Sequence, residues 1–353
     1  MHSNKVRALF WAADGLEFPP GYADLIVRFF GDVAADSGQP SNVYGVTPEY
    51  GDAAGPAAYD STYAARIDDA MPYPAGTCVS PDRPRCLDDN QLEAELDRVI
   101  AAHGLPIGVG ELYAVFTPPG MSVCRSRGVC SDNAFCGFHY ALAAGTPYMF
   151  VAPPENGRCG SSAQPNGNVA DEALSVVSHE HIEAITDPLG NAWGDAAGQE
   201  VADKCERSFG QPLGNTTTGA YNQLINGRPY WLQGEWSNAA GECVHHAPVA
   251  PPTAVIAAPA VVAKGQSSVL DAHGSDGLGI RSDWDLPDGT TASGPEVQYR
   301  FGKDGAAPIT LRVTDAVGQT ATAQVTVDVR KTSPRVSVRA RRVGAMRWRF
   351  SAA

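Results

Sequence analysis

Residues 176–188 read Val-Val-Ser-His-Glu-His-Ile-Glu-Ala-Ile-Thr-Asp-Pro. An apolar lead-in, a charged segment and a closing proline predict a helix that ends just before Pro188. Residues four apart lie on one face of a helix, so His179 and Glu183 are expected side by side. This pair is able to bind one metal ion, and Glu180 would then lie beside a water bound to that metal.

The pattern His179-Glu180-x-x-Glu183 is a variant of the H-E-x-x-H helix of zinc metallopeptidases, in which the last position is a second histidine. Zinc accepts carboxylate oxygen, so the exchange is chemically allowed. An anionic ligand makes a bound water less acidic and better tolerates a harder cation such as Mn²⁺ or Ca²⁺. We predict a Zn²⁺ site, with another divalent cation as an alternative, and Glu180 as general base. His181 points about 200° away from His179 and is not expected to be a ligand.

The segment Gly198–Cys205 supplies candidates for a third ligand. Peptidases of the thermolysin type take a glutamate at a similar distance beyond the helix, followed by an aspartate that orients the first histidine. By that resemblance Glu200 would be the third metal ligand and Asp203 the partner of His179. Weaker ligand candidates are Asp187, His139 and Asp203 itself.

Other interpretations of the same residues stay open. A short H-E-x-x-E match arises by chance, in which case both glutamates are surface charges and His179 is a partly buried structural histidine. His139, in a cysteine-flanked loop, is interpreted as structural. Ser178 lacks the G-x-S-x-G elbow of serine hydrolases, and the even number of cysteines argues against a free nucleophilic thiol. Three aromatic residues could line a substrate cleft, although core packing is their commoner use: Tyr230, Trp231 and Trp236.

The cysteines and the composition indicate a secreted protein. All eight cysteines lie between Cys78 and Cys243, with no CxxC spacing that would favour a zinc cluster. Proximity favours four disulfides, although 105 connectivities are possible: Cys78–Cys86, Cys124–Cys130, Cys136–Cys159 and Cys205–Cys243. No apolar run approaches the roughly 20 residues of a membrane span. No signal peptide is visible, so secretion would imply either that the chain has lost its leader or that its start is misplaced.

The charge is unevenly distributed. The net charge is −13, yet residues 330–353 hold eight basic residues and no acidic one. The remaining 18 basic and 39 acidic residues make an acidic body, which argues against nucleic-acid binding. The basic end could touch an anionic cell surface, but a solvated flexible tail is the simpler interpretation.

Two domains and a tail are expected from 353 residues. Residues 1–246 are predicted to form an α+β metallopeptidase-like domain with four disulfides. Its strands are expected at 6–12, 42–46, 112–116 and 148–152, and its helices after Pro19 or Pro20, from Asp88 or Asp89 to Gly104, and from about Asn168. Residues 247–330 are predicted to form a β-sandwich, and residues 331–353 a flexible basic tail.

The sandwich is predicted from short alternating strands at 254–257, 268–271, 280–285, 297–301, 309–314 and 321–329. This segment resembles a PKD domain, an immunoglobulin-like module, through Trp284-Asp-Leu-Pro-Asp-Gly289, Leu311-x-Val-Thr-Asp-x-x-Gly318 and Thr320-Ala-Thr-Ala. Trp284 would fill the core and Asp288-Gly289 would form a hairpin turn. The resemblance implies a spacer, or a module that binds substrate or a surface.

A second resemblance covers roughly residues 5–244, to secreted bacterial relatives of the phosphate-induced, EXORDIUM-like family. It is carried by Ser178–Trp193, Gly198–Cys205, Tyr221–Gln233 and Glu235-Trp-Ser-Asn, and also by Val115-Phe-Thr-Pro-Pro-Gly120 and Phe135-Cys-Gly-Phe-His139. The resemblance implies secretion and a peptidase-like fold. Plant members of the family are extracellular and linked to growth and cell-wall responses.

Two hypotheses follow. The first is a secreted metal-dependent hydrolase, a zinc peptidase acting on polypeptide or a cell-surface or wall substrate, in which His179, Glu183 and Glu200 hold the metal. The second is a non-catalytic extracellular or wall-associated binding protein that retains the fold.

Overall fold

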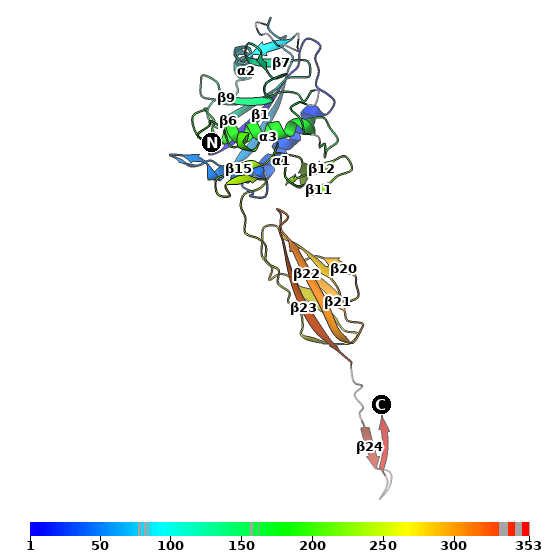
Figure 1. Cartoon of the computed structure of the whole chain (residues 1–353). Coiled ribbons are helices and arrows are strands. Elements are labelled where there is room, and N and C mark those ends of the chain that lie inside the picture. Colours follow the sequence, from blue (N-terminus) through cyan, green and yellow to red (C-terminus); the bar gives the residue numbers. More distant parts are fainter. Residues whose placement is uncertain are drawn as a thin grey trace. The chain divides into compact units, whose positions relative to one another are not determined.

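The computed structural model describes residues 1–76, 78, 80, 83, 85–155, 158–161, 163–331, 338–342 and 348–352. The chain divides into two compact units, Met1–Pro248 and Val249–Ala353, which are described separately (Figure 1). Within the described ranges, no helix has both the length and the apolar character needed to cross a bilayer.

The first unit is built on a five-stranded sheet with strand order β4-β1-β6-β10-β9. The strands are β1 (Asn4–Trp11), β4 (Ser61–Asp69), β6 (Glu111–Phe116), β9 (Gly137–Ala141) and β10 (Pro147–Val151). β1 pairs in parallel with β4 and β6, and β10 pairs in parallel with β6; β9 alone is antiparallel, at the outer edge. β6 and β10 are buried along almost their whole length, which explains why they are near-continuous apolar runs.

A mostly parallel sheet makes this unit α/β, which corrects the α+β prediction. The missed element is β4, where intermediate and exposed residues alternate as expected of an edge strand with one solvated face. Without β4, the unit β1–α1–β4, in which a helix joins two parallel strands, could not be recognised in the sequence. The strand predicted at 42–46 is also wrong. Its place is taken by the 3₁₀ helix η1 (Val43–Glu49), which begins where the Asn42 side chain accepts a hydrogen bond from the Tyr44 N–H.

The three predicted helices of this unit are confirmed as α1 (Tyr22–Ala35), α2 (Asp89–His103) and α3 (Ala170–Thr186). α1 and α3 pack together on one face of the sheet, and α2 packs on the other face (Figure 1). Asp88 and Gln91 form a capping box on α2, and Gly104 ends it with a positive φ of 59°. In α3, 14 of the 17 residues are buried, including His181, Glu180 and Glu183. Buried charges in such a helix need partners.

Short elements and disulfides complete the first unit. A three-stranded sheet comprises β5 (Cys86–Asp88), β7 (Ser122–Ser126) and β8 (Val129–Cys130). Four strand pairs are β2 (Gly51–Asp52) with β3 (Gly55–Pro56), β11 (Gly214–Asn215) with β12 (Ala220–Tyr221), β13 (Gln223–Ile225) with β14 (Arg228–Tyr230), and β15 (Glu235–Ser237) with β16 (Glu242–Val244). The 3₁₀ helix η2 spans Asp203–Cys205. All four predicted disulfides are confirmed.

The second unit is a β-sandwich. One sheet has the order β17-β23-β22-β19-β20, and the other pairs β18 with β21. The strands are β17 (Val261–Ala263), β18 (Ser267–Asp271), β19 (Arg281–Asp285), β20 (Thr291–Ser293), β21 (Glu296–Arg300), β22 (Gly305–Thr314) and β23 (Thr320–Arg330). Trp284 is buried in its core, as predicted. The predicted strand at 254–257 is wrong, because that segment makes only an isolated bridge at Ala257.

The basic tail was predicted to be flexible, and part of it is paired. β24 (Val338–Arg342) and β25 (Trp348–Ala352) form an antiparallel hairpin. The rest of the prediction, over residues 332–337, 343–347 and 353, lies outside the described residues.

Candidate metal centre

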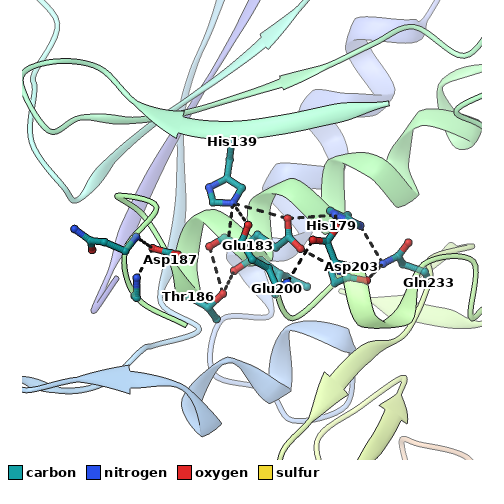
Figure 2. Close-up of polar contacts among 12 residues, drawn as sticks. His139, His179, Glu183, Thr186, Asp187, Glu200, Asp203 and Gln233 are labelled. Carbon is teal, nitrogen blue, oxygen red and sulfur yellow. Dashed lines mark hydrogen bonds and ion pairs between the residues drawn. The ribbon is translucent and has the colours of Figure 1, made fainter. Parts of the chain in front are cut away.

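Polar side chains from three parts of the first unit point toward one another in a cleft of about 570 Å³ (Figure 2). His139 comes from the edge strand β9, and Glu200 and Asp203 come from the segment that enters η2. The other three, His179, Glu180 and Glu183, lie along α3. Strand, helix and loop therefore meet at one polar cluster that lines this cleft.

The distances among the histidines and glutamates suit a shared cation. His139 Nε2 lies 3.1 Å from Glu200 Oε2 and 3.8 Å from Glu183 Oε2. On the other side, His179 Nε2 lies 3.2 Å from Glu183 Oε2. Ligand atoms about 2.1 Å from a tetrahedral zinc ion are about 3.4 Å apart, so each of these three pairs is close enough to share an ion.

Two overlapping groups have ligand atoms that all lie within 4.8 Å of one another: His139, Glu183 and Glu200, and His179, Glu180 and Glu183. Glu183 belongs to both groups. The predicted set of His179, Glu183 and Glu200 forms no such group among the residues described, because Glu200 faces His139. The structure thus places His139, which we had interpreted as structural, in the cluster.

Neighbouring groups hold His179 and Glu183 in place. The Gln233 side-chain amide lies 3.1 Å from His179 Nδ1 and donates a hydrogen bond of 2.9 Å to the Ala202 carbonyl. Asp203 lies 3.5 Å from His179 Nε2, the nitrogen that also faces Glu183, and its backbone N–H donates to Glu183 Oε1 at 3.1 Å. Gln233 therefore contacts Nδ1 of His179, whereas Asp203, the expected partner of this histidine, lies at Nε2. Neither the sequence motif nor its spacing pointed to Gln233.

The electrostatics of the cluster are those of crowded, buried carboxylates. Burial is the main cause that raises the pKa of Glu180, to about 8, and burial also raises the pKa of Glu200. For His139, burial lowers the pKa, but the carboxylates of Glu200, Glu180 and Glu183 outweigh it and raise the pKa to about 9. Among the ion pairs between described residues, no lysine or arginine pairs with these glutamates. A divalent cation would supply the positive charge that protons supply here, so the donor set fits a metal.

Glu235 is a further buried carboxylate near the cluster. It is fully buried on β15, and neither of its oxygens has a hydrogen-bond partner in the described part of the chain. Burial raises its pKa well above the usual value, and the nearby charge of His179 only partly offsets this. Sequence reasoning missed it, since nothing in Gly-Glu-Trp-Ser marks a buried acid.

Glu235→Gln is expected to stabilise the metal-free protein increasingly as pH rises. The folded state holds a proton that the unfolded chain, with a glutamate pKa of about 4.3, releases. The contribution of Glu235 to the free energy of unfolding therefore falls as pH rises above about 4, by at most roughly 1.4 kcal/mol per pH unit. It stops falling when the pH reaches the pKa of Glu235 in the folded state. Thermal unfolding in EDTA at pH 4, 6 and 8 measures the effect. Glu242→Gln, exposed on the paired strand β16, is the control, and a constant offset at all three pH values would contradict the assignment.

Comparison with known proteins supports distant relationships for both parts of the chain. Residues 249–329 match the PKD domain family. The N-terminal part is distantly homologous to EXORDIUM-like proteins. Protein EXORDIUM-like 3 of Arabidopsis thaliana is 32% identical over 143 residues, which cover 36% of this chain and 39% of that protein. Protein EXORDIUM-like 5 of the same plant is 28% identical over 131 residues, covering 29% and 36%. The chain thus spans less than half the length of these relatives.

Solved structures similar to this chain include PKD domains. The PKD1 domain of Vibrio anguillarum Epp is 24% identical, with a TM-score of 0.22 over 24% of this chain and 100% of that one. The PKD1 domain of the Vibrio cholerae metalloprotease PrtV is 29% identical, with a TM-score of 0.20 over 23% and 98%. Scores this low carry no functional argument. The C-terminal unit is a PKD β-sandwich, and with the disulfides it suggests an extracellular protein.

Proposed function

We propose that the chain is an extracellular hydrolase that depends on a divalent cation, Zn²⁺ in the first instance, and that polypeptides are its substrates. The observation that carries the proposal is the pair of overlapping ligand groups, His139–Glu183–Glu200 and His179–Glu180–Glu183, which share Glu183 in an open cleft.

The four ligands in this proposal are two imidazoles and two carboxylates. With His139 included, the site gains a neutral donor beyond the one histidine and two carboxylates that the motif alone suggests. A bound cation would supply the charge that acidifies a water and polarises a carbonyl. Two imidazoles suit zinc, while the two carboxylates leave Mn²⁺ or Ca²⁺ as alternatives.

Glu180 is the general base in this proposal. Its side chain lies at the cleft beside His179 and Glu183 and is only 4% exposed, so little bulk water competes for its carboxylate. Glu180 takes a proton from the attacking water and delivers it to the leaving nitrogen of a peptide bond. The Asp203 backbone N–H holds Glu183 during that exchange, and the PKD unit spaces or anchors the enzyme at its substrate.

A specific observation favours the alternative, a non-catalytic extracellular or wall-associated binding protein. The pairs His139–Glu200 and His139–Glu183 also have the distances of simple ion pairs, and such pairs would tie β9 to the loop and to α3. In that case the same residues serve the fold alone.

One comparison separates the two functions. Metal content and the cleavage of a fluorescein-labelled, reduced and carboxymethylated protein are measured for the purified full chain, before and after EDTA. The hydrolase requires about one cation per chain and cleavage that disappears with EDTA and returns with Zn²⁺. A folded chain that binds no cation and cleaves nothing would leave the structural alternative.

Gly137→Ala is expected to reduce cleavage by about 100-fold without removing the metal. A Cβ at residue 137 would lie 2.5 Å from Glu180 Oε1, so the carboxylate must move. A displacement near 1 Å at a catalytic group costs about that factor. The control is Gly31→Ala, where a Cβ meets no atom within 4 Å. Cleavage rate and metal content are measured for both, and full activity in the Gly137 variant would mean that Glu180 does not act from this position.

A further inference from the structure

The outer edge of β9 is the feature of the cleft that the proposed chemistry does not use. Among the described residues, β9 is the last strand of the sheet and pairs only with β10. Beyond its two ends, the Ala152 N–H donates to the Cys136 carbonyl and the Leu142 N–H donates to the Thr146 carbonyl, both at 2.9 Å. Each of these bonds joins directly opposite residues in the β9–β10 register, so both are hydrogen-bonded pairs.

Hydrogen-bonded and non-hydrogen-bonded pairs alternate along an antiparallel ladder. Counting from Cys136 and Leu142, the residues Gly137, His139 and Ala141 occupy the non-hydrogen-bonded positions relative to β10. Their N–H and C=O groups therefore point away from the sheet. None of the hydrogen bonds recorded between described residues uses these six groups. Pro147, which has no N–H to give, lies opposite Ala141, as this phase requires.

The opposite edge of the same sheet is protected, and β9 is not. β4 carries a register irregularity against β1 and exposed charges such as Arg66 and Asp68, which discourage pairing with another chain. β9 reads Gly-Phe-His-Tyr-Ala, without lysine, proline or a bulge. An unprotected edge strand can pair with another chain and cause aggregation, unless the protein uses the edge to bind a ligand.

This free edge borders the candidate metal centre. Gly137, His139 and Tyr140 line the cleft, and so do Gly160 and Ser161 from the loop that the Cys136–Cys159 disulfide ties to β9. His139 reaches Glu200 from this same strand, and Gly137 packs directly against Glu180. In Figure 2, His139 extends from β9 toward the glutamates of α3 and the loop.

We propose that β9 binds an extended polypeptide as an added strand, through the outward N–H and C=O groups of Gly137, His139 and Ala141. These groups recur every second residue, about 6.6 Å apart, which is the repeat of another β-strand. An unfolded or exposed polypeptide segment is thus the ligand, recognised mainly by its main chain and with broad tolerance of side chains. The inference rests on the proposed function only for the fate of the bound strand, which is cleaved where it passes Glu180. Binding itself does not depend on that function.

The test removes one outward donor and nothing else from the ladder. Ala141→Pro loses the N–H that points at the ligand, and a proline is tolerated where an edge strand's N–H faces outward. Ala141→Val keeps the N–H and is the matched control. Both are made in the full chain carrying Glu180→Gln, so that the probe is not cleaved. The probe is fluorescein-labelled, reduced and carboxymethylated α-lactalbumin, and its binding is followed by anisotropy with Zn²⁺ and with EDTA.

We expect the proline variant to bind the probe at least tenfold more weakly than its parent and the valine variant to bind within about twofold of it. Equal binding by both variants, with unchanged melting temperatures, overturns main-chain pairing. If the proline variant has a lowered melting temperature, the test is made with the parent chain instead. The ligand is then a Lys-flanked decapeptide of alternating valine and threonine, with and without N-methylated amides. Binding of this peptide must fall at least tenfold when its amides are N-methylated, and unchanged binding overturns the inference.

Two further outcomes keep this inference apart from the proposed function. Displacement of the probe by cellohexaose at the same site would point to a polysaccharide ligand and overturn the inference. If the chain binds no cation but the proline and valine variants still differ tenfold in affinity for the probe, strand addition is supported and the proposed hydrolase function is contradicted.

Discussion

Replacing His139 by alanine is expected to lower the affinity of the chain for Zn²⁺ by more than about 100-fold, since even residues that only orient a ligand are worth 10- to 100-fold. Nε2 of His139 lies 3.1 Å from Glu200 and 3.8 Å from Glu183, and in the proposed centre it would be the neutral imidazole ligand between them. Without it two carboxylates face each other across the position that the imidazole filled.

The affinity of the His139 variant is measured by competition with a chromogenic chelator. His103→Ala is the control, because that histidine is exposed at the end of α2 and lies outside the cluster. A His139→Ala chain that keeps its melting temperature and binds Zn²⁺ as tightly as wild type would mean that β9 contributes no ligand.

Glu180→Gln is expected to reduce cleavage of unfolded protein by about 10²- to 10⁴-fold, the range for loss of a general base. Glutamine has nearly the shape of glutamate, so the close packing against Gly137 is kept while the proton acceptor is lost. The metal content is expected to stay near one cation per chain, because Glu180 is not among the four proposed ligands.

The control for this experiment is Glu172→Gln, a cleft-lining glutamate of α3 outside both ligand groups. It should cleave within a fewfold of wild type. If the Glu180 and Glu172 variants lose activity equally, the loss reflects the charge of the cleft, and Glu180 is not the base.

Local patterns were sufficient for the helix that carries the centre. The apolar lead-in and Pro188 predict α3, and helix geometry alone brings His179 and Glu183 together. The capping residues of α2 and the proximity of the cysteine pairs were equally local, and both predictions are confirmed. Such features depend on residues within a few turns of one another.

Features set by distant pairing could not be predicted in this way. His139 lies 44 residues before Glu183 and reaches it only because β9 folds back on β10 beneath the helix that carries Glu183. Gln233 and Glu235 arrive from further along the chain in a segment without periodicity. The edge strand β4 was not predicted, because a strand with one solvated face lacks the apolar run by which buried strands are recognised. Without β4 the parallel character of the sheet was not apparent from the sequence.

The most direct measurement is the position of the cation itself. A crystal of the full chain grown with Zn²⁺ is measured on both sides of the zinc absorption edge, and an anomalous difference map locates the ion. We predict one strong peak within about 2.0–2.3 Å of His139, His179, Glu183 and Glu200. A map with no peak there, or with zinc only at an exposed group such as Asp271, His273 and Glu296, would contradict the proposed centre.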